Sequence, residues 1–436
     1  MANSTGVETI ISRAIAASLP LGARIPPRAL VRLVPPLPVA PSTGCRDLRE
    51  LAERNVTFLS FLKHLSRCRD GDLVRGRVRS YIVNPTITSH RARKAAMRRH
   101  GFGGIGALVL TPSVECNLDC ALCYNKHHPD PEVRLSFEAM DRVVKQAVEL
   151  GAARVSVVGG EPLMQWRDVH ALAETNPDVL FTVMTNGTLL TPEIAHAFAT
   201  LPNAELSFSI DGFRETNDRL RGRGTYDLVT SAMRLYRDVG GMVVYSPTIT
   251  RESYREVLSD EFVDTMIANG AYMAYHHHYY LVGGQDRADL LLGAEERRWI
   301  SRRIREVTTT RPLIVFDNLL SGLFRGGCHA VREYVHVNHR GGVEPCCMVP
   351  FAHGSVHDAP LAEVLRSGFF SALRSLPADE SGIRRCLVGG SCLAFREVVE
   401  RESAIPSSPR ALDVFASDRV ARRDQLPTCF SADAAV

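Results

Sequence analysis

Three cysteines lie close together directly after an apolar segment, at Cys116, Cys120 and Cys123. Their spacing, C-x3-C-x2-C, allows one short loop to bring three thiolates to a single inorganic centre. A structural zinc site takes four protein ligands and usually occurs as paired C-x2-C units. Three thiolates suit a [4Fe–4S] cluster instead, because they hold three irons and leave the fourth open to a small molecule. A coincidental group of buried cysteines is the plain alternative, and the polar residues between them make it the weaker interpretation.

This loop resembles the cluster-binding loop of radical S-adenosylmethionine (SAM) enzymes. The resemblance implies that the open iron binds the amino and carboxylate groups of SAM. It also implies that the reduced cluster cleaves SAM to a 5′-deoxyadenosyl radical, which abstracts a hydrogen from the substrate. The family usually has an aromatic residue just before the third cysteine, where this chain has Leu122. The aromatic residue here is Tyr124, one position after that cysteine, and the resemblance assigns it to the adenine pocket.

Composition places the chain among ordinary globular proteins. Of its 436 residues 45% are hydrophobic and 23% are charged, and the formal net charge is +4. This balance does not indicate nucleic-acid binding. The apolar segment 10–40 is interrupted by arginines and prolines, so we expect neither a membrane span nor a signal peptide. The odd count of 11 cysteines, several of them clustered, indicates metal ligation in a reducing compartment, and we expect a cytoplasmic protein.

The segment 106–285 alternates between strand-like and helix-like patterns. Repeats of this kind predict βαβ units, a parallel sheet and, with six units, an α/β fold built as a partial (β/α)6 TIM-type barrel. The family resemblance implies the same three-quarter barrel. The expected strands are 107–112, 154–158, 179–185, 205–210, 242–249 and 271–281, and the expected helices are 135–150, 166–174, 192–200, 225–239 and 253–269.

The second expected strand leads into Gly159, Gly160, Glu161 and Pro162. Functional groups of parallel barrels lie at the carboxyl ends of the strands, where the cysteine loop is also expected. Glycines permit close backbone approach, and a carboxylate accepts hydrogen bonds from a cation. A tight turn with proline at the start of a helix explains the same residues structurally. The motif is similar to the family's GGEP motif, which implies contact with the amino group of SAM.

Polar residues also follow the third and fourth expected strands. Asn186 and Asp211 lie in Asx-Gly sequences that could be simple turns. By resemblance, Ser209 and Asp211 contact the SAM ribose or carboxylate, and Asn186 joins the cofactor site. Segment 217–222 resembles the family's "HD..RG" segment, with Asn217 in place of histidine. Arg221 in this segment could pair the SAM carboxylate, and a surface arginine is an equally good interpretation.

The sixth expected strand carries three consecutive histidines. Because strand side chains alternate, His276 and His278 share one face and His277 lies on the other. We expect His276 and His278 to line the substrate site, with hydrogen-bonded structural histidines as the alternative.

Four further cysteines form a pattern in the C-terminal part. Cys328 and Cys346 occur as C-x12-G-x4-C, and Cys386 and Cys392 follow as C-x5-C. A hairpin expected at 335–344 would bring the first two together. The arrangement resembles the SPASM/twitch extension of radical SAM enzymes, which implies one auxiliary [4Fe–4S] cluster. Zinc bound by the same four thiolates is the alternative, and the role of Cys347 stays open.

These patterns divide the chain into five expected parts. Segment 1–105 is a mostly helical extension, with helices at about 7–18 and 46–67. Its basic run over 91–100 is a solvated helix face or, alternatively, a site that attracts an acidic substrate or a leader peptide. The other parts are the barrel over 106–285, a helical connector over 286–320, the cluster domain over 321–402 and a tail over 403–436.

The predicted function is a radical SAM enzyme of natural-product biosynthesis that dehydrogenates, epimerises or rearranges a small metabolite, such as a sugar or aminocyclitol. A peptide-maturing enzyme and a non-catalytic zinc or iron–sulfur scaffold are the alternatives. An auxiliary cluster without an open iron would transfer electrons. The expected partners are the substrate and an external one-electron donor such as flavodoxin or ferredoxin, with no nucleic acid and no membrane.

Overall fold

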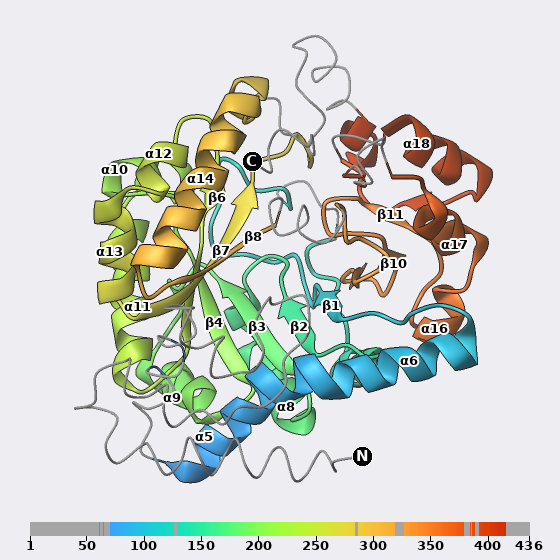
Figure 1. The fold of residues 1–436 in the computed structure, drawn as a ribbon, viewed down its shortest axis with the longest axis horizontal. Coiled ribbons are helices and arrows are strands. Elements are labelled where there is room, and N and C mark those ends of the chain that lie inside the picture. The colour runs from blue at the N-terminus through green and yellow to red at the C-terminus, as the bar shows by residue number, and fades with distance from the viewer. Residues whose placement is uncertain are drawn as a thin grey trace.

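A computed structural model describes residues 61, 64, 70–125, 130–283, 287–318, 327–378, 384, 386–388 and 392–415. The helix expected at 7–18, all of the helix expected at 46–67 except residues 61 and 64, and most of the expected tail lie outside these residues. The described part is a curved parallel sheet with helices on its outer face and a smaller C-terminal lobe beside it (Figure 1). The expected α/β partial barrel is thereby confirmed.

Six parallel strands form the barrel in the order β1-β2-β3-β4-β5-β7. Helices between them cover the outer face, and several begin where a hydroxyl caps the first turn; Ser136, Thr191 and Ser259 each accept a hydrogen bond from a backbone N–H three residues later. The strands are β1 (Ala107–Leu110), β2 (Arg154–Val157), β3 (Leu180–Thr185), β4 (Ala204–Ser209), β5 (Val243–Ser246) and β7 (Ala271–His278), and the helices are α7 (Phe137–Glu149), α8 (Trp166–Thr175), α9 (Pro192–Thr200), α10 (Arg214–Arg221), α11 (Thr225–Asp238), α12 (Tyr254–Val257) and α13 (Asp260–Ala268).

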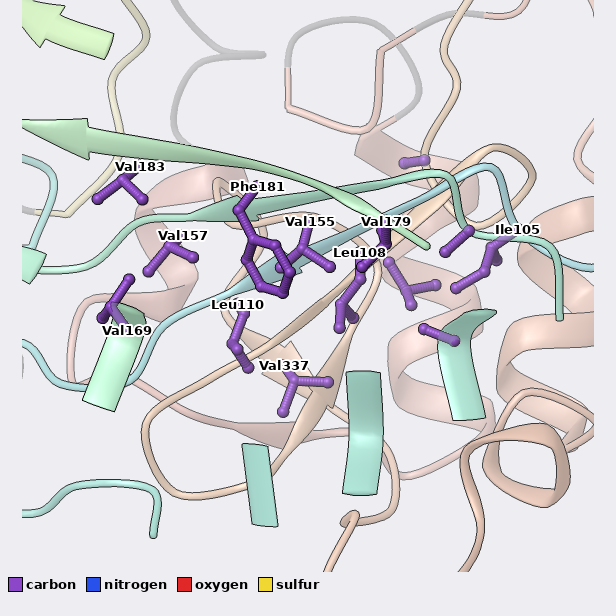
Figure 2. Packing of buried hydrophobic residues seen from close by; sticks show 14 of the residues in the cluster. Ile105, Leu108, Leu110, Val155, Val157, Val169, Val179, Phe181, Val183 and Val337 are labelled. Carbon is purple, nitrogen blue, oxygen red and sulfur yellow. The ribbon is translucent and has the colours of Figure 1, made fainter. Parts of the chain in front are cut away.

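The main core lies between the sheet and its outer helices. Leu108 and Leu110 of β1, Phe181 of β3 and Val169 of α8 are almost completely buried there (Figure 2). Val337 from the C-terminal part packs in the same cluster. Because this core combines residues from both parts of the chain, the C-terminal hairpin folds onto the barrel.

That hairpin is a continuation of the barrel sheet. Strand β9 (Tyr334–Val337) pairs in parallel with β1, and β10 (Val343–Glu344) pairs antiparallel with β9. Gly341 in the turn has φ +82°, and a Cβ there would lie 2.5 Å from the His357 ring. The expected hairpin is confirmed, and its pairing with β1 was not predicted. The lobe continues through β11 (Phe351–Ala352), α16 (Leu361–Val364), α17 (Gly368–Ser375), α18 (Cys392–Arg401), β12 (Ile405–Pro406) and the 3-10 helix η6 (Ala411–Phe415).

Three sequence-based boundaries are wrong. The strand expected over 242–249 is two strands, β5 and β6 (Thr248–Ile249), because Pro247 between them has no N–H for the ladder. The helix expected over 253–269 is divided into α12 and α13, where Ser259 caps a new helix. The helical connector expected over 286–320 contains the 3-10 helix η5 (Ala288–Leu290), α14 (Ala294–Thr310) and also strand β8 (Ile314–Asp317), which pairs in parallel with β7.

The N-terminal helices cover the end of the barrel where β3, β4 and β5 begin. They are α5 (Gly71–Val78), the π-helix η3 (Arg79–Thr88) and α6 (Ser89–His100). Arg77 is buried and donates hydrogen bonds to the carbonyl oxygens of Ala199 (3.1 Å) and Gly240 (2.8 Å), which precede β4 and β5. Within the described residues, no helix is both long and apolar enough to cross a membrane.

Candidate active site

The three-cysteine loop follows β1 at the carboxyl end of the sheet. Cys116 is exposed, and Cys120 and Cys123 are partly buried; none forms a disulfide. The loop is anchored where the N–H of Ala121 donates to the carbonyl of Leu220 (2.8 Å). The pKa of Cys120 is raised to about 11, mainly by burial and in smaller part by the neighbouring thiols of Cys123 and Cys116. Thiols grouped in this way resist ionisation until a cation compensates their charge, so the donor set fits an iron–sulfur cluster.

The Gly159–Pro162 motif is bound to the start of this loop by its backbone. The N–H of Gly160 donates to the carbonyl of Ser113 (3.0 Å), and the N–H of Glu161 donates to that of Glu115 (2.8 Å). A Cβ at Gly160 would lie 1.9 Å from the Glu115 oxygen, and one at Gly159, where φ is +127°, would lie 2.2 Å from the Ser113 oxygen. The glycines are therefore required by close backbone approach, and Pro162 begins the short 3-10 helix η4 (Pro162–Gln165).

Glu161 links the motif to the end of β3. Its side chain is 3% exposed, and it accepts hydrogen bonds from the N–H of Leu163 (2.9 Å), the hydroxyl of Thr185 (2.8 Å) and the N–H of Asn186 (2.7 Å). Burial raises the pKa of this carboxyl group, whereas the three donors act in the opposite direction. Glu161 therefore fixes the position of the β3 turn, a structural role that the sequence did not indicate.

Asn186 in turn contacts the cysteine loop. Its amide donates to the side-chain oxygen of Asn117 (2.9 Å), and the Asn117 amide donates to the hydroxyl of Thr188 (2.8 Å). Asn117 lies between the first two cysteines and was not recognised from the sequence as a site residue. These contacts bring the ends of β1, β2 and β3 together around the thiols.

Asp211 and Arg221 form an ion pair beside Cys120. Arg221 Nε lies 2.6 Å from Asp211 Oδ2, and Asp211 Oδ1 accepts from the N–H of Thr248 (2.7 Å). The positive charge of Arg221 partly opposes the rise in the pKa of Cys120, which places the guanidinium close to that thiol. Ser209, at the end of β4, is partly exposed. The predicted contact of these residues with SAM stays a prediction.

Asn217, which replaces the family's histidine, is completely buried. Its side-chain oxygen accepts from the N–H of Asp211 (3.1 Å), and its amide donates to the hydroxyl of Thr225 (2.9 Å). It therefore holds the backbone of Asp211 in place.

The C-terminal thiols lie in two contacting pairs. A hydrogen bond with Cys386 lowers the pKa of Cys328 to about 7, whereas the hydrogen bond with Cys347, together with burial, raises the pKa of Cys346. The hydroxyl of Tyr334 donates to the sulfur of Cys346 (3.1 Å). Three of the four predicted ligands, Cys328, Cys346 and Cys386, are thus in contact with another thiol, and Cys347 is the partner of Cys346. The side chain of the fourth, Cys392, lies outside the described residues. Among the residues that the structure describes, no three His, Cys, Asp or Glu side chains form a site for a single metal ion.

Tyr124 lies between the two thiol groups. Burial raises the pKa of its hydroxyl well above its ordinary value, and Cys347, Cys123 and Cys346 add to the rise. A residue influenced by thiols of both groups lies on the boundary between the two sites. The adenine contact implied by the resemblance remains a prediction.

The structure does not place His276 and His278 on the inner face of the barrel. Both are buried on the outer face, where His278 Nε2 lies 2.9 Å from Asp317 Oδ2 and the His276 ring packs edge-on against Tyr245. The inner face carries His277 instead, stacked on Tyr275 with ring centroids 4.8 Å apart. The substrate assignment of His276 and His278 is therefore corrected: alternation separates the two sets but does not say which set faces inward.

Burial of His276 predicts a loss of stability in acid. Burial lowers the pKa of His276 to about 4, and the nearby Asp317 carboxylate opposes this only in part. As pH falls from about 6.5 towards 4, the unfolded chain binds a proton that the folded chain does not bind. The free energy of unfolding should therefore decrease by about 1.4 kcal/mol per pH unit from this group.

Denaturant unfolding at several pH values measures this contribution. The substitution His276→Phe should reduce the slope of the free energy of unfolding against pH by the amount that corresponds to about one proton taken up on unfolding. The control His90→Asn, at an exposed histidine, should leave this slope unchanged. An unchanged slope in His276→Phe would contradict the assignment.

Comparison with known proteins identifies two domains. Residues 110–260 match the model of the radical SAM superfamily, and residues 328–392 match that of the SPASM iron–sulfur cluster-binding domain. Among relatives, Fe-coproporphyrin III synthase of Methanosarcina barkeri is 26% identical over 48% of this chain and 54% of its own length. Mycofactocin maturase MftC of Mycolicibacterium smegmatis is 27% identical over 58% of this chain and 66% of its own. The chain thus matches less than two thirds of either relative.

A solved structure has the same fold. Streptococcus suis SuiB bound to S-adenosylmethionine aligns with a TM-score of 0.55 and 20% identity over 67% of this chain and 73% of its own. SuiB bound to its precursor peptide SuiA aligns with a TM-score of 0.53 and 19% identity over 70% and 72%. The two domains confirm the predicted cofactor classes, [4Fe–4S] clusters and SAM. The chain belongs to the radical SAM superfamily and carries a SPASM-type cluster-binding domain in its C-terminal part.

Proposed function

We propose that this chain is a radical SAM enzyme that abstracts a hydrogen atom from a peptide substrate during its maturation. The observation that carries the proposal is the joining of three strand ends around Cys116, Cys120 and Cys123 by the contacts of Gly160 and Glu161. When bound there, a reduced [4Fe–4S] cluster and SAM supply a 5′-deoxyadenosyl radical, the chemistry that the protein itself cannot perform.

The residues of the chain position these groups. Glu161 holds the turn after β3, Asn186 and Asn117 hold the cysteine loop, and Asp211 orients Arg221 beside Cys120. A preorganised site of this kind needs little rearrangement when its cofactors bind. The C-terminal thiols would hold a second cluster without an open iron, which suits electron transfer.

A peptide substrate is favoured by the relation to MftC, whose name is that of a maturase. The small-metabolite prediction has a different kind of support, because Fe-coproporphyrin III synthase is related at similar identity. Neither of these two relatives is named as acting on a sugar or aminocyclitol. A small molecule therefore remains the second candidate, with a reduced flavodoxin or ferredoxin as the proposed electron source in either case.

Anaerobic reconstitution tests the proposal. The chain should bind about eight irons, from two four-iron clusters, and should form 5′-deoxyadenosine when dithionite and SAM are added. Bound zinc with little iron would support the non-catalytic scaffold instead. Full iron loading without deoxyadenosine would also contradict the proposed activity.

A further inference from the structure

We propose that the exposed face of α6 is the docking surface for an acidic one-electron carrier protein, which exchanges electrons with the C-terminal cysteine site. This inference rests on the proposed function, because it assumes that the C-terminal thiols hold a redox-active cluster. It assigns a role to a basic helix that the proposed reaction leaves unexplained.

The helix presents a compact cationic face. Ser89 and Ala96 are buried on one side of α6, and Arg91, Lys94 and Arg98 lie on the opposite side, exposed and within one to two turns of each other. Met97 at the edge of this face is 52% exposed. An exposed methionine beside exposed cations is a composition found at protein–protein interfaces, and charged residues there speed association.

Within the part of the chain that the structure describes, the cations of this face have no acidic partner. Sequence Ser89–His100 contains no acidic residue, and among the described residues no carboxylate pairs with Arg91, Lys94 or Arg98. Some exposed arginines elsewhere do have such partners; Arg287 pairs with Asp289, and Arg396 pairs with Glu400. Because like charges repel, an uncompensated group of cations is expected where an anionic partner binds.

The helix is joined to the strand that contacts the C-terminal thiols. Arg93 makes two hydrogen bonds to the Glu333 carboxylate, at 2.7 and 2.9 Å. The next residue is Tyr334, whose hydroxyl lies 3.1 Å from the sulfur of Cys346. The three-cysteine loop lies at the other end of the sheet, after β1 ends. A carrier on α6 would therefore exchange electrons with the C-terminal site.

The chemical step is a transfer of one electron. The carrier is reduced by one electron and the C-terminal site is oxidised by one, or the reverse, and no bond is made or broken. An acidic flavodoxin or ferredoxin has the required charge and redox chemistry. Charge complementarity would speed its association and make binding sensitive to salt.

The test uses the cluster-loaded chain and an acidic flavodoxin as the probe. The double substitution Lys94→Glu and Arg98→Glu reverses the charge of two cations on the exposed face of α6. The matched control, Arg302→Glu with Arg305→Glu, reverses the charge of two exposed cations on α14. We expect the α6 pair to weaken the Kd for flavodoxin by about tenfold or more, and the control pair to change it by less than about twofold. Raising the salt concentration from about 20 mM to about 500 mM should weaken flavodoxin binding to the wild type but not to the α6 variant.

Binding and catalysis are measured separately in this design. Deoxyadenosine formation driven by dithionite tests the proposed function and should be the same in the α6 variant, because a small reductant needs no docking surface. Equal flavodoxin affinity in all three chains would overturn the inference. Loss of binding of an acidic peptide, with flavodoxin unaffected, would also overturn it and make α6 a peptide-binding face.

Discussion

The substitution Cys120→Ala is expected to remove about half of the iron and to reduce deoxyadenosine formation to background. Two remaining thiolates cannot hold three irons of a cube, so the first site should lose its four irons while the C-terminal site keeps its own. The loss of activity should exceed the roughly 10- to 100-fold losses in metal affinity or activity that follow substitution of residues that only support metal ligands. Iron analysis and chromatography of the SAM products measure both quantities.

Cys68→Ala is the matched control for this experiment, because Cys68 has no partner at ligand spacing. It should retain full iron and full activity. Cys346→Ala should lose the other half of the iron, which separates the two sites. If Cys120→Ala kept its iron and its activity, the assignment of the three-cysteine loop would be wrong.

The substitution Gly160→Ala has the second-largest expected effect. Its Cβ would lie 1.9 Å from the carbonyl oxygen of Glu115, and both atoms belong to the backbone or are fixed to it, so no side-chain rotation relieves the clash. Separating the two segments would break the hydrogen bonds from Gly160 to Ser113 and from Glu161 to Glu115. We expect a loss of about 3 kcal/mol or more in the free energy of unfolding, together with impaired iron loading.

Gly103→Ala serves as the control for the glycine experiment. A Cβ at Gly103 meets nothing closer than the Met97 terminal methyl at 3.9 Å. Its free energy of unfolding should stay within about 0.5 kcal/mol of the wild type. Equal stability and iron content in the two variants would show that the cysteine loop does not depend on this contact.

Much of the barrel could be predicted because its signals are local. Apolar runs such as Leu108–Leu110 and periodic helices such as Phe137–Glu149 contain their own pattern, and their alternation predicts a parallel sheet. Strand β8 was missed because its four residues follow a long helix, and its pairing with β7 depends on contacts far along the chain. The polar helix α10 was missed because it has too few apolar residues to show a helical hydrophobic pattern.

In the site, too, the features with a local sequence pattern were predicted and those that depend on distant contacts were not. The cysteine spacing and the Gly-Gly-Glu-Pro run are contiguous, and the sequence identified both. The hydrogen bond between Asn117 and Asn186, by contrast, joins positions 69 residues apart, so spacing could not reveal it. The orientation of His276 could not be predicted either. Its neighbour on the outer face is Asp317, which lies on β8, a strand that the sequence did not indicate.

We expect three thiolates to hold a cluster whose fourth iron remains free for SAM. The electron paramagnetic resonance spectrum of the dithionite-reduced Cys346→Ala chain, recorded with and without SAM, tests this open iron most directly. Only the first site should carry a cluster in this variant, so the spectrum reports that site alone. SAM is predicted to change the signal. An identical spectrum in the presence of excess SAM would contradict the account.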